Sequence, residues 1–240
     1  MNIALIGYGK MGKAIEEIAL ERGHTITVKC NSENNIEFAD FSNVDVAIEF
    51  TKPSLAVTHI NFCLDKSIPL VIGTTGWNDH IAEVEQKTKE LNGALLHASN
   101  FSVGVNIFFE LNKKLAQLMS GQIDYSASID EIHHLQKIDS PSGTAITLAN
   151  GILENNTDYI SWAHGKDTTP YTSQEQLPLT SFRQPEVPGT HSIKYTSDID
   201  TITITHEAHN RKGFALGAVI AAEWIINHKG SFTMSDVLNF

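Results

Sequence analysis

Cysteine, basic residues and long apolar runs are all scarce in this chain of 240 residues. The two cysteines, Cys30 and Cys63, lie far apart without the spacing of metal ligands, so we expect buried free thiols in a reducing cytoplasm. No apolar run approaches the roughly 20 residues that cross a bilayer. The N-terminal MNIALIGYGK has no basic leader and is predicted to be a strand rather than a signal peptide. These features predict a cytoplasmic protein.

Positive charge is the scarcer sign: 17 Lys and Arg stand against 28 Asp and Glu, for a net charge of −11. An acidic surface repels nucleic acid and anionic lipid, so we expect neither as a partner. An anionic substrate would therefore need a local basic pocket. The hydrophobic fraction of 41% indicates a globular chain with one large domain or two modest ones.

The first hundred residues alternate between strand and helix patterns. Short apolar runs predict strands, and Ala14, Ile15, Ile18 and Ala19 recur at helical spacing before Gly23. The repeated β-α-β order predicts a Rossmann-type parallel sheet with right-handed crossovers. The expected strands are residues 3–6, 25–28, 44–50, 69–72 and 94–97, with later helices at about 52–64 and 78–91.

The pattern changes near residue 102. We expect an amphipathic helix over 102–119 with one apolar side formed by Ile107, Phe108, Leu111, Leu115 and Leu118. The remaining expectations are a strand at 125–133, a helix at 142–155, a loop with four prolines over 157–189, paired strands at 190–196 and 200–208, and a helix at 214–226. The predicted class is α/β, with a dinucleotide-binding domain of residues 1–102 plus 212–240 and an α+β substrate-binding and oligomerisation domain of residues 103–211.

A glycine-rich loop follows the first predicted strand and precedes the first helix. It reads GxGxxG, and its residues are Gly7, Tyr8, Gly9, Lys10, Met11 and Gly12. Such glycines let the backbone approach a pyrophosphate, and the helix start stabilises an anion by about 0.3–1 kcal/mol. The loop therefore predicts a dinucleotide site. The competing interpretation is a tight turn without a ligand.

The end of the second strand carries Lys29 where NAD-preferring folds place an acid. A lysine favours a 2′-phosphate, so we expect NADPH to be used at least as well as NADH. The alternative is a solvated charge at a strand end. Loops at 50–53, 73–76 and 98–102 follow further strands and are rich in Gly, Thr, Ser and Asn. Ligands lie at the carboxyl ends of parallel strands, so these loops are predicted to extend the cofactor groove.

A second anion site is predicted in the other half of the chain. His133, His134 and Lys137 end a strand, and Ser142, Gly143 and Thr144 begin a helix whose amides can hold a carboxylate. A histidine there can donate a proton near neutral pH. The alternatives are a surface histidine pair or a metal site. Adjacent histidines on a strand point to opposite faces, so we expect no metal.

The segment from Glu131 to Ala145 reads E-x-H-H-x-x-K-x-D-x-P-S-G-T-A. Five further segments accompany it: GYGKMG at 7–12, FTKP at 50–53, GTTGW at 73–77, ASNFSVGVN at 98–106 and THEAHNRKGFALGA at 205–218. Together they resemble the 4-hydroxy-tetrahydrodipicolinate reductases. The resemblance implies reduction of a cyclic hydroxylated imine dicarboxylate by NADPH or NADH, with loss of water, in diaminopimelate and lysine biosynthesis.

The resemblance also implies roles for individual residues and a homotetramer. His133 becomes the general acid/base and Lys137 a proton donor that also binds a substrate carboxylate, while two hinges, near Ser102 and Arg211, close the domains. His134, Gly143 and Thr144 would bind substrate. The cofactor would contact the GYGKMG loop, Arg211, and Gly73, Thr74, Thr75, Ala98, Ser99, Asn100 and Phe101.

Some features depart from the family pattern. The family's acid after the second strand is absent, and Gln184 and Pro185 replace small residues in a loop that we expect to be structural or at a subunit interface. Arg183, Gly189 and His191 match the family but are left out of the predicted site. Two other functions remain open: another Rossmann dehydrogenase acting on amino acids or imines, and a dinucleotide sensor without catalysis.

Overall fold

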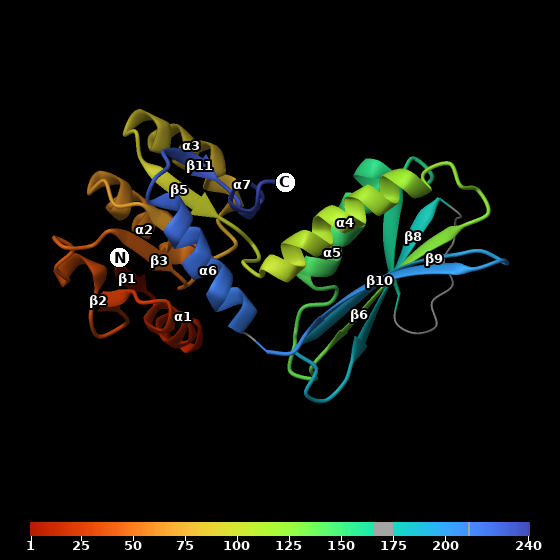
Figure 1. Cartoon of the computed structure of the whole chain (residues 1–240), viewed down its shortest axis with the longest axis horizontal. Coiled ribbons are helices and arrows are strands. Elements are labelled where there is room, and N and C mark those ends of the chain that lie inside the picture. Colours follow the sequence, from red (N-terminus) through yellow and green to blue (C-terminus); the bar gives the residue numbers. More distant parts are fainter. Residues whose placement is uncertain (166–174, 211) are drawn as a thin grey trace. The chain divides into compact units, whose positions relative to one another are not determined.

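A computed structural model describes residues 1–165, 175–210 and 212–240. The chain forms two compact units, Met1–Val103 with Lys212–Phe240, and Gly104–Arg211. Each unit has its own sheet, and its buried apolar side chains pack on that sheet (Figure 1). Within the described ranges, no helix is both long and apolar enough to cross a membrane.

The first unit contains a six-stranded sheet in the order β11-β5-β4-β3-β1-β2, and every pair in it is parallel. The chain first moves from β1 outward to β2 and then returns to the other side of β1. This reversal makes the carboxyl ends of β1 and β3 the position where ligands bind in such sheets. The strands are β1 Asn2–Ile6, β2 Thr25–Cys30, β3 Val46–Glu49, β4 Leu70–Ile72, β5 Ala94–His97 and β11 Gly230–Phe232.

Helices cover both faces of this sheet. Side chains alternate along β1, so Leu5 packs in a core with α1 and α6, whereas Ile6 packs in a second core with α2 and α3. Burial on both faces explains why the strands read as short continuous apolar runs. The helices are α1 Lys10–Glu21, α2 Pro53–Asp65, α3 Ile81–Glu90, α6 Lys212–Ile225 and α7 Met234–Leu238, with 3₁₀ turns at Ile36–Phe38 and Asn78–His80.

The second unit contains a five-stranded mixed sheet in the order β10-β9-β6-β8-β7. Figure 1 shows α4 and α5 side by side over one side of it, where Phe108, Leu148 and Ile129 share a core. The elements are α4 Val103–Met119, β6 Ser126–His133, α5 Gly143–Asn155, β7 Ser161–Gly165, β8 Gln176–Arg183, β9 Gly189–Thr196 and β10 Thr201–Ala208. The predicted pairing of the last two strands is confirmed, because β9 and β10 are antiparallel neighbours.

The prediction of a loop over residues 157–189 is wrong for residues 161–165 and 176–183. It contains β7 and β8, and residues 166–174 between them lie outside the described residues. Pro178 suggested a loop, but it occupies the interior of β8 opposite Ala163 of β7. Leu177 and Leu179 on either side of it are fully buried, and this burial outweighs the unfavourable proline.

The predicted apolar side of α4 is confirmed for Phe108 and Leu115, which pack in the core, and wrong for its other three residues. Ile107, Leu111 and Leu118 are exposed in the chain, whereas Phe108 is buried with Asn112 and three apolar residues, Val105, Ala116 and Met119. Asn112 can lie on this face because its Nδ2 donates a hydrogen bond of 2.9 Å to the carbonyl of Leu148 in α5. Its Oδ1 has no hydrogen-bond partner among the described residues, so only half of the amide is satisfied. Periodicity of apolar residues alone could not place a polar residue on the buried face.

Candidate functional site

The glycine-rich loop packs directly on the carboxyl end of β3. Gly7 has φ +99°, and a Cβ there would overlap with the carbonyl oxygen of Phe50. A Cβ on Gly12 would overlap with the carbonyl oxygen of Gly7. Gly9 is different, because a Cβ on it would meet open space. Backbone packing therefore requires glycine at Gly7 and Gly12. At Gly9 the absence of a side chain leaves space beside the backbone of the loop.

A cavity of about 640 Å³ opens at this loop within the first unit. Gly9 is the N-cap of α1, and no side chain caps the helix, so its first-turn amides face the loop without a side-chain acceptor. This arrangement suits a pyrophosphate. Lys10, Met11 and Gly12 begin the helix itself. The residues lining the cavity are Ile6, Gly7, Tyr8, Gly9, Cys30, Asn31, Ser32, Asn35, Ile36, Glu37, Thr51, Lys52, Leu55, Thr58 and His59.

Lys29 is bound to neighbouring side chains rather than free in solvent. Its Nζ lies 2.6 Å from Oε1 of Glu16 and 3.3 Å from the hydroxyl of Tyr8, which itself donates a hydrogen bond to Glu16. Hydrogen bonds from Lys29 and Tyr8 hold the pKa of Glu16 below its usual range. Glu16 therefore opposes part of the charge that Lys29 offers to a 2′-phosphate, while Lys52 lines the same cavity and adds a positive charge.

Sequence reasoning missed a buried carboxylate beneath the cavity. Glu49, at the end of β3, is fully buried and accepts hydrogen bonds from the hydroxyl of Thr51 and from Nδ1 of His59, the latter at 3.0 Å. The backbone amide of Thr51 donates to Oγ1 of Thr74 at 2.7 Å. The loops after β3 and β4 are thereby joined, and His59 reaches the cavity wall. His59 lies in α2, ten residues after Glu49, and no sequence pattern predicts that these two side chains form a hydrogen bond.

The other predicted cofactor loops lie at the same edge of the sheet, after β4 and β5. A Cβ on Gly73 would overlap with the ring of Phe50, and the ring of Phe101 lies 5.6 Å from that of Phe50. Phe101 is buried in the core, so only its backbone is available to a ligand. Ala98, Ser99 and Asn100 precede it in this loop, and Thr75 follows Thr74. Arg211 lies outside the described residues.

The second unit brings the predicted catalytic residues together at the end of β6. His133 is buried, and its Nδ1 lies 3.4 Å from Oε2 of Glu131. His134 is the first residue after β6 and is half-buried. Nζ of Lys137 lies 2.9 Å from Oδ2 of Asp139. Burial raises the pKa of Asp139, but Lys137 outweighs that effect and lowers it. A substrate carboxylate would compete with Asp139 for this lysine.

The start of α5 adjoins this cluster as predicted. Ser142 is the N-cap, and its Oγ accepts from the amide of Ala145 at 3.1 Å. Its own amide donates to both carboxylate oxygens of Glu131, at 3.1 and 3.2 Å. A Cβ on Gly143 would meet no atom within 4 Å, which leaves room for a ligand above the first turn. Thr144 follows in the same turn.

Three residues that were left out of the predicted site lie against this cluster. Nε2 of His191 lies 3.1 Å from Oγ of Ser142, and Nη1 of Arg183 lies 3.7 Å from Oε1 of Glu131. A Cβ on Gly189 would lie 3.0 Å from Nε2 of His133. Strand pairing causes this, because Glu131 faces His191 of β9 and Ser181 of β8 across the sheet.

Burial and hydrogen bonds set the charges of the cluster. Burial raises the pKa of Glu131, but the neighbouring side chains of His133 and His191 and the hydrogen bonds from Ser142 and Ser181 outweigh it and hold that pKa far below its usual range. Burial lowers the pKa of His191. Ligand atoms of Glu131, His133 and His191 lie within 4.8 Å of one another, as a metal would require. Glu131 also accepts hydrogen bonds from the amide of Ser142 and the hydroxyl of Ser181.

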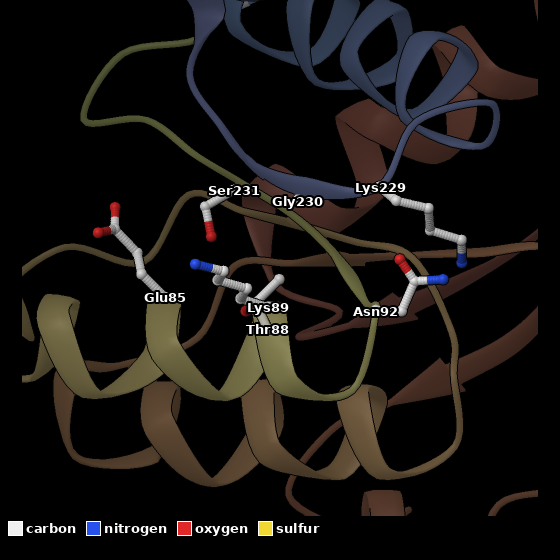
Figure 2. A pocket seen from close by; sticks show the side chains of 7 residues that line it. All are labelled: Glu85, Thr88, Lys89, Asn92, Lys229, Gly230 and Ser231. Atoms are coloured by element: carbon white, nitrogen blue, oxygen red, sulfur yellow. The ribbon is translucent and has the colours of Figure 1, made fainter.

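A second hollow of about 400 Å³ lies beside the edge strand β11 in the first unit. Figure 2 shows Lys229 and Asn92 at one end and Glu85 at the other, with Lys89 between them. Oγ of Ser231 is buried here and has no hydrogen-bond partner among the described residues. The strand order puts β11 farthest from β2, so this hollow is separate from the glycine-rich loop.

Comparison with known proteins matches both halves of the chain to one family. Residues 1–101 match the family description "Dihydrodipicolinate reductase, N-terminus", and residues 104–238 match "Dihydrodipicolinate reductase, C-terminus". The chain belongs to the dihydrodipicolinate reductase family. This confirms the resemblance seen in the six sequence segments.

Individual relatives agree with this family. The chain is 50% identical to the 4-hydroxy-tetrahydrodipicolinate reductase of Christiangramia forsetii, over 100% of the chain and 98% of that protein. It is 35% identical to the reductase of the same name from Rickettsia rickettsii, over 99% and 98%.

Solved structures share the architecture at lower identity. A dipicolinate-bound dihydrodipicolinate reductase from Paenisporosarcina sp. TG-14 has a TM-score of 0.73 at 22% identity, with 97% of both chains covered. An amine dehydrogenase from Mycobacterium smegmatis has a TM-score of 0.63 at 9% identity, over 98% of this chain and 95% of that one. The predicted Rossmann-type fold with a second α+β unit is confirmed.

Proposed function

We propose that this chain reduces 4-hydroxy-tetrahydrodipicolinate to tetrahydrodipicolinate in diaminopimelate and lysine biosynthesis. Full-length membership of the reductase family carries the proposal, together with the 50% identity to a reductase of that name. The substrate, a reduced nicotinamide cofactor and one proton give the product, the oxidised cofactor and water. The cofactor supplies the hydride, and the protein binds both reactants, donates the proton and excludes solvent.

The first unit is proposed to bind the dinucleotide. The uncapped start of α1, the close packing of Gly7 and Gly12, and the adjoining cavity all suit a pyrophosphate. Lys52 in the cavity wall and Lys29 beside Tyr8 support use of NADPH at least as well as NADH, although Glu16 opposes Lys29 and Glu37 lines the same cavity. The reaction is proposed to need no metal.

The second unit is proposed to bind the substrate. The amides at the start of α5, with Gly143 and Thr144, would hold one carboxylate, and Lys137 and His134 would hold the other. His133 would donate the proton, a role that typically contributes about 10²–10⁴-fold to a rate. Lys137, bound to the second substrate carboxylate, would also neutralise the negative charge that develops on the substrate when the hydride is transferred.

We also propose a cytoplasmic homotetramer. The two cysteines are buried free thiols as expected, and burial raises the pKa of Cys30 to about 11, which keeps it protonated. Exposed apolar residues on α4, among them Ile107 and Leu118, support burial of further surface in an assembly. Light scattering after size-exclusion chromatography tests the tetramer, and a monomeric mass at micromolar concentration would refute it.

A coupled assay tests the reaction. A synthase that condenses pyruvate with aspartate semialdehyde supplies the unstable imine, and oxidation of NADPH and NADH is followed in parallel. We expect turnover that depends on the synthase and falls at least about 100-fold in His133→Gln. Turnover with amino acids or other imines but not with this substrate would favour a different dehydrogenase. Cofactor binding without any turnover would favour a sensor.

A further inference from the structure

Glu131 is the only carboxylate that contacts both the helix start and the proposed catalytic imidazole among the described residues. It is fully buried, and two chain segments beyond its own strand donate to it: the amide of Ser142 at 3.1 and 3.2 Å, and the hydroxyl of Ser181 at 2.6 Å. Arg183 adds a guanidinium at 3.7 Å. A buried carboxylate with this many donors is fixed in position and ionised.

The two ring nitrogens of His133 face different surroundings. Nδ1 is buried, makes no hydrogen bond within the described residues and lies 3.4 Å from the carboxylate of Glu131, whereas a Cβ on Gly189 would lie 3.0 Å from Nε2. A carboxylate beside one ring nitrogen favours the tautomer that carries hydrogen on that nitrogen, and it stabilises the protonated ring. Nε2 is then the nitrogen left for chemistry, and Gly189 leaves the space for it.

We propose that Glu131 is a positioning residue, which holds His133 in the Nδ1–H tautomer and fixes that imidazole relative to the anion-binding start of α5. The proposal rests on the proposed function, because it takes His133 as the proton donor: the imidazolium gives its Nε2 proton to the substrate, and the neutral ring that remains is the Nδ1–H tautomer. The contacts that carry it are those of one carboxylate with the ring of His133 and the amide of Ser142. Glu131 itself would touch neither substrate nor cofactor.

Glu131→Gln separates charge from shape. The amide oxygen of Gln can still accept from Ser142, so the start of α5 and the KM for the imine should change by less than about threefold. The negative charge beside Nδ1 is lost, so kcat should fall roughly 10- to 100-fold, the range typical of a residue that orients a functional histidine. Asp130→Asn is the matched control, because Asp130 is the preceding residue and bonds Lys194 at 2.8 Å instead.

The tautomer provides a readout that a merely structural role would not change. ¹⁵N NMR of the protein without ligands reports which ring nitrogen of His133 carries hydrogen, and the signal absent from His133→Gln assigns it. We expect Nδ1–H in the wild type and in Asp130→Asn, and a shift toward Nε2–H in Glu131→Gln. Thermal unfolding of each variant shows whether it has kept its fold.

Three results would overturn the proposal. An Nε2–H tautomer in the wild type would do so even if Glu131→Gln failed to fold. A folded Glu131→Gln protein with kcat within about twofold of wild type would do so as well. A loss of kcat with an unchanged tautomer would assign Glu131 a structural role only. If the wild type does not reduce the imine at all, the proposed function fails, but the tautomer comparison still decides how His133 is held.

Discussion

Gly189 of β9 lies against the ring of His133 of β6, so closely that a methyl group on Gly189 would sit 3.0 Å from Nε2. That separation is tighter than ordinary van der Waals contact, so the ring in Gly189→Ala must move by a few tenths of an ångström. We expect kcat to fall roughly tenfold, because small misplacements of a reacting group are costly. Steady-state kinetics in the coupled assay measure it, and Ser192→Ala, on the exposed side of β9, is the control.

The glycine-rich loop separates two roles of glycine. Gly12→Ala forces a Cβ onto the carbonyl oxygen of Gly7, so we expect a lower melting temperature as well as weaker cofactor binding. Gly9→Ala meets no atom within 4 Å, so its melting temperature should stay close to wild type while NADPH binding weakens through a less close backbone approach. Thermal unfolding and fluorescence titration with NADPH measure these effects. Equal melting temperatures in both variants would contradict the packing role of Gly12.

The pair of Lys29 and Glu16 offers a test of cofactor preference in both directions. Glu16→Gln releases Lys29 from its ion pair of 2.6 Å and should strengthen NADPH binding relative to NADH by up to about fivefold, the effect of an exposed pair of about 0.2–1 kcal/mol. Lys29→Glu should reverse the preference. Dissociation constants for both cofactors give the ratio. Unchanged ratios in both variants would show that Lys29 does not approach the 2′ position.

The fold of the first unit could be predicted because its signals are local. β1, β3, β4 and β5 are short apolar runs, and α1 carries its own periodicity, so their order predicts a parallel sheet. β11 and α7 were not predicted, because they are too short to show either pattern. The second unit was harder to predict, because single residues there are unusual for the strand or the buried helix face on which they lie. Pro178 argued against a strand at β8, although β7 pairs with it in the folded chain. Asn112 argued against the buried face of α4, although its hydrogen bond to Leu148 forms in the folded chain.

The candidate site shows the same limit. One motif of ten residues contains His133, Lys137 and Ser142, so they could be recognised together from the sequence. His191 reaches them only through the register of β6 with β9, which pairs Glu131 with His191 sixty residues later. No local pattern encodes that register. A buried Glu in the middle of an otherwise apolar alternation, Ala127–Ile129–Glu131, was the available signal, because such a residue requires partners from neighbouring strands.

His191 also makes the stability of the protein depend on pH. Burial holds its pKa below the ordinary 6.5, so as pH falls through 6.5 the unfolded chain takes up a proton before the folded one does. Stability is therefore lost on acidification, and His191→Gln should lose less of it. Between pH 7.5 and 5.5 we expect the free energy of unfolding to fall more in wild type than in the variant, by at most about 1.4 kcal/mol, the limit for one proton over the pH unit below 6.5.

Urea unfolding at the two pH values measures this difference. Glu131 does not confuse the measurement, because its pKa lies far below its ordinary value of 4.5, so its contribution is fully present in this window and is lost only at more acidic pH. Equal losses in wild type and His191→Gln would mean that the folded protein binds a proton at His191 as readily as the unfolded chain. The imidazole would then face water rather than the buried network around Glu131.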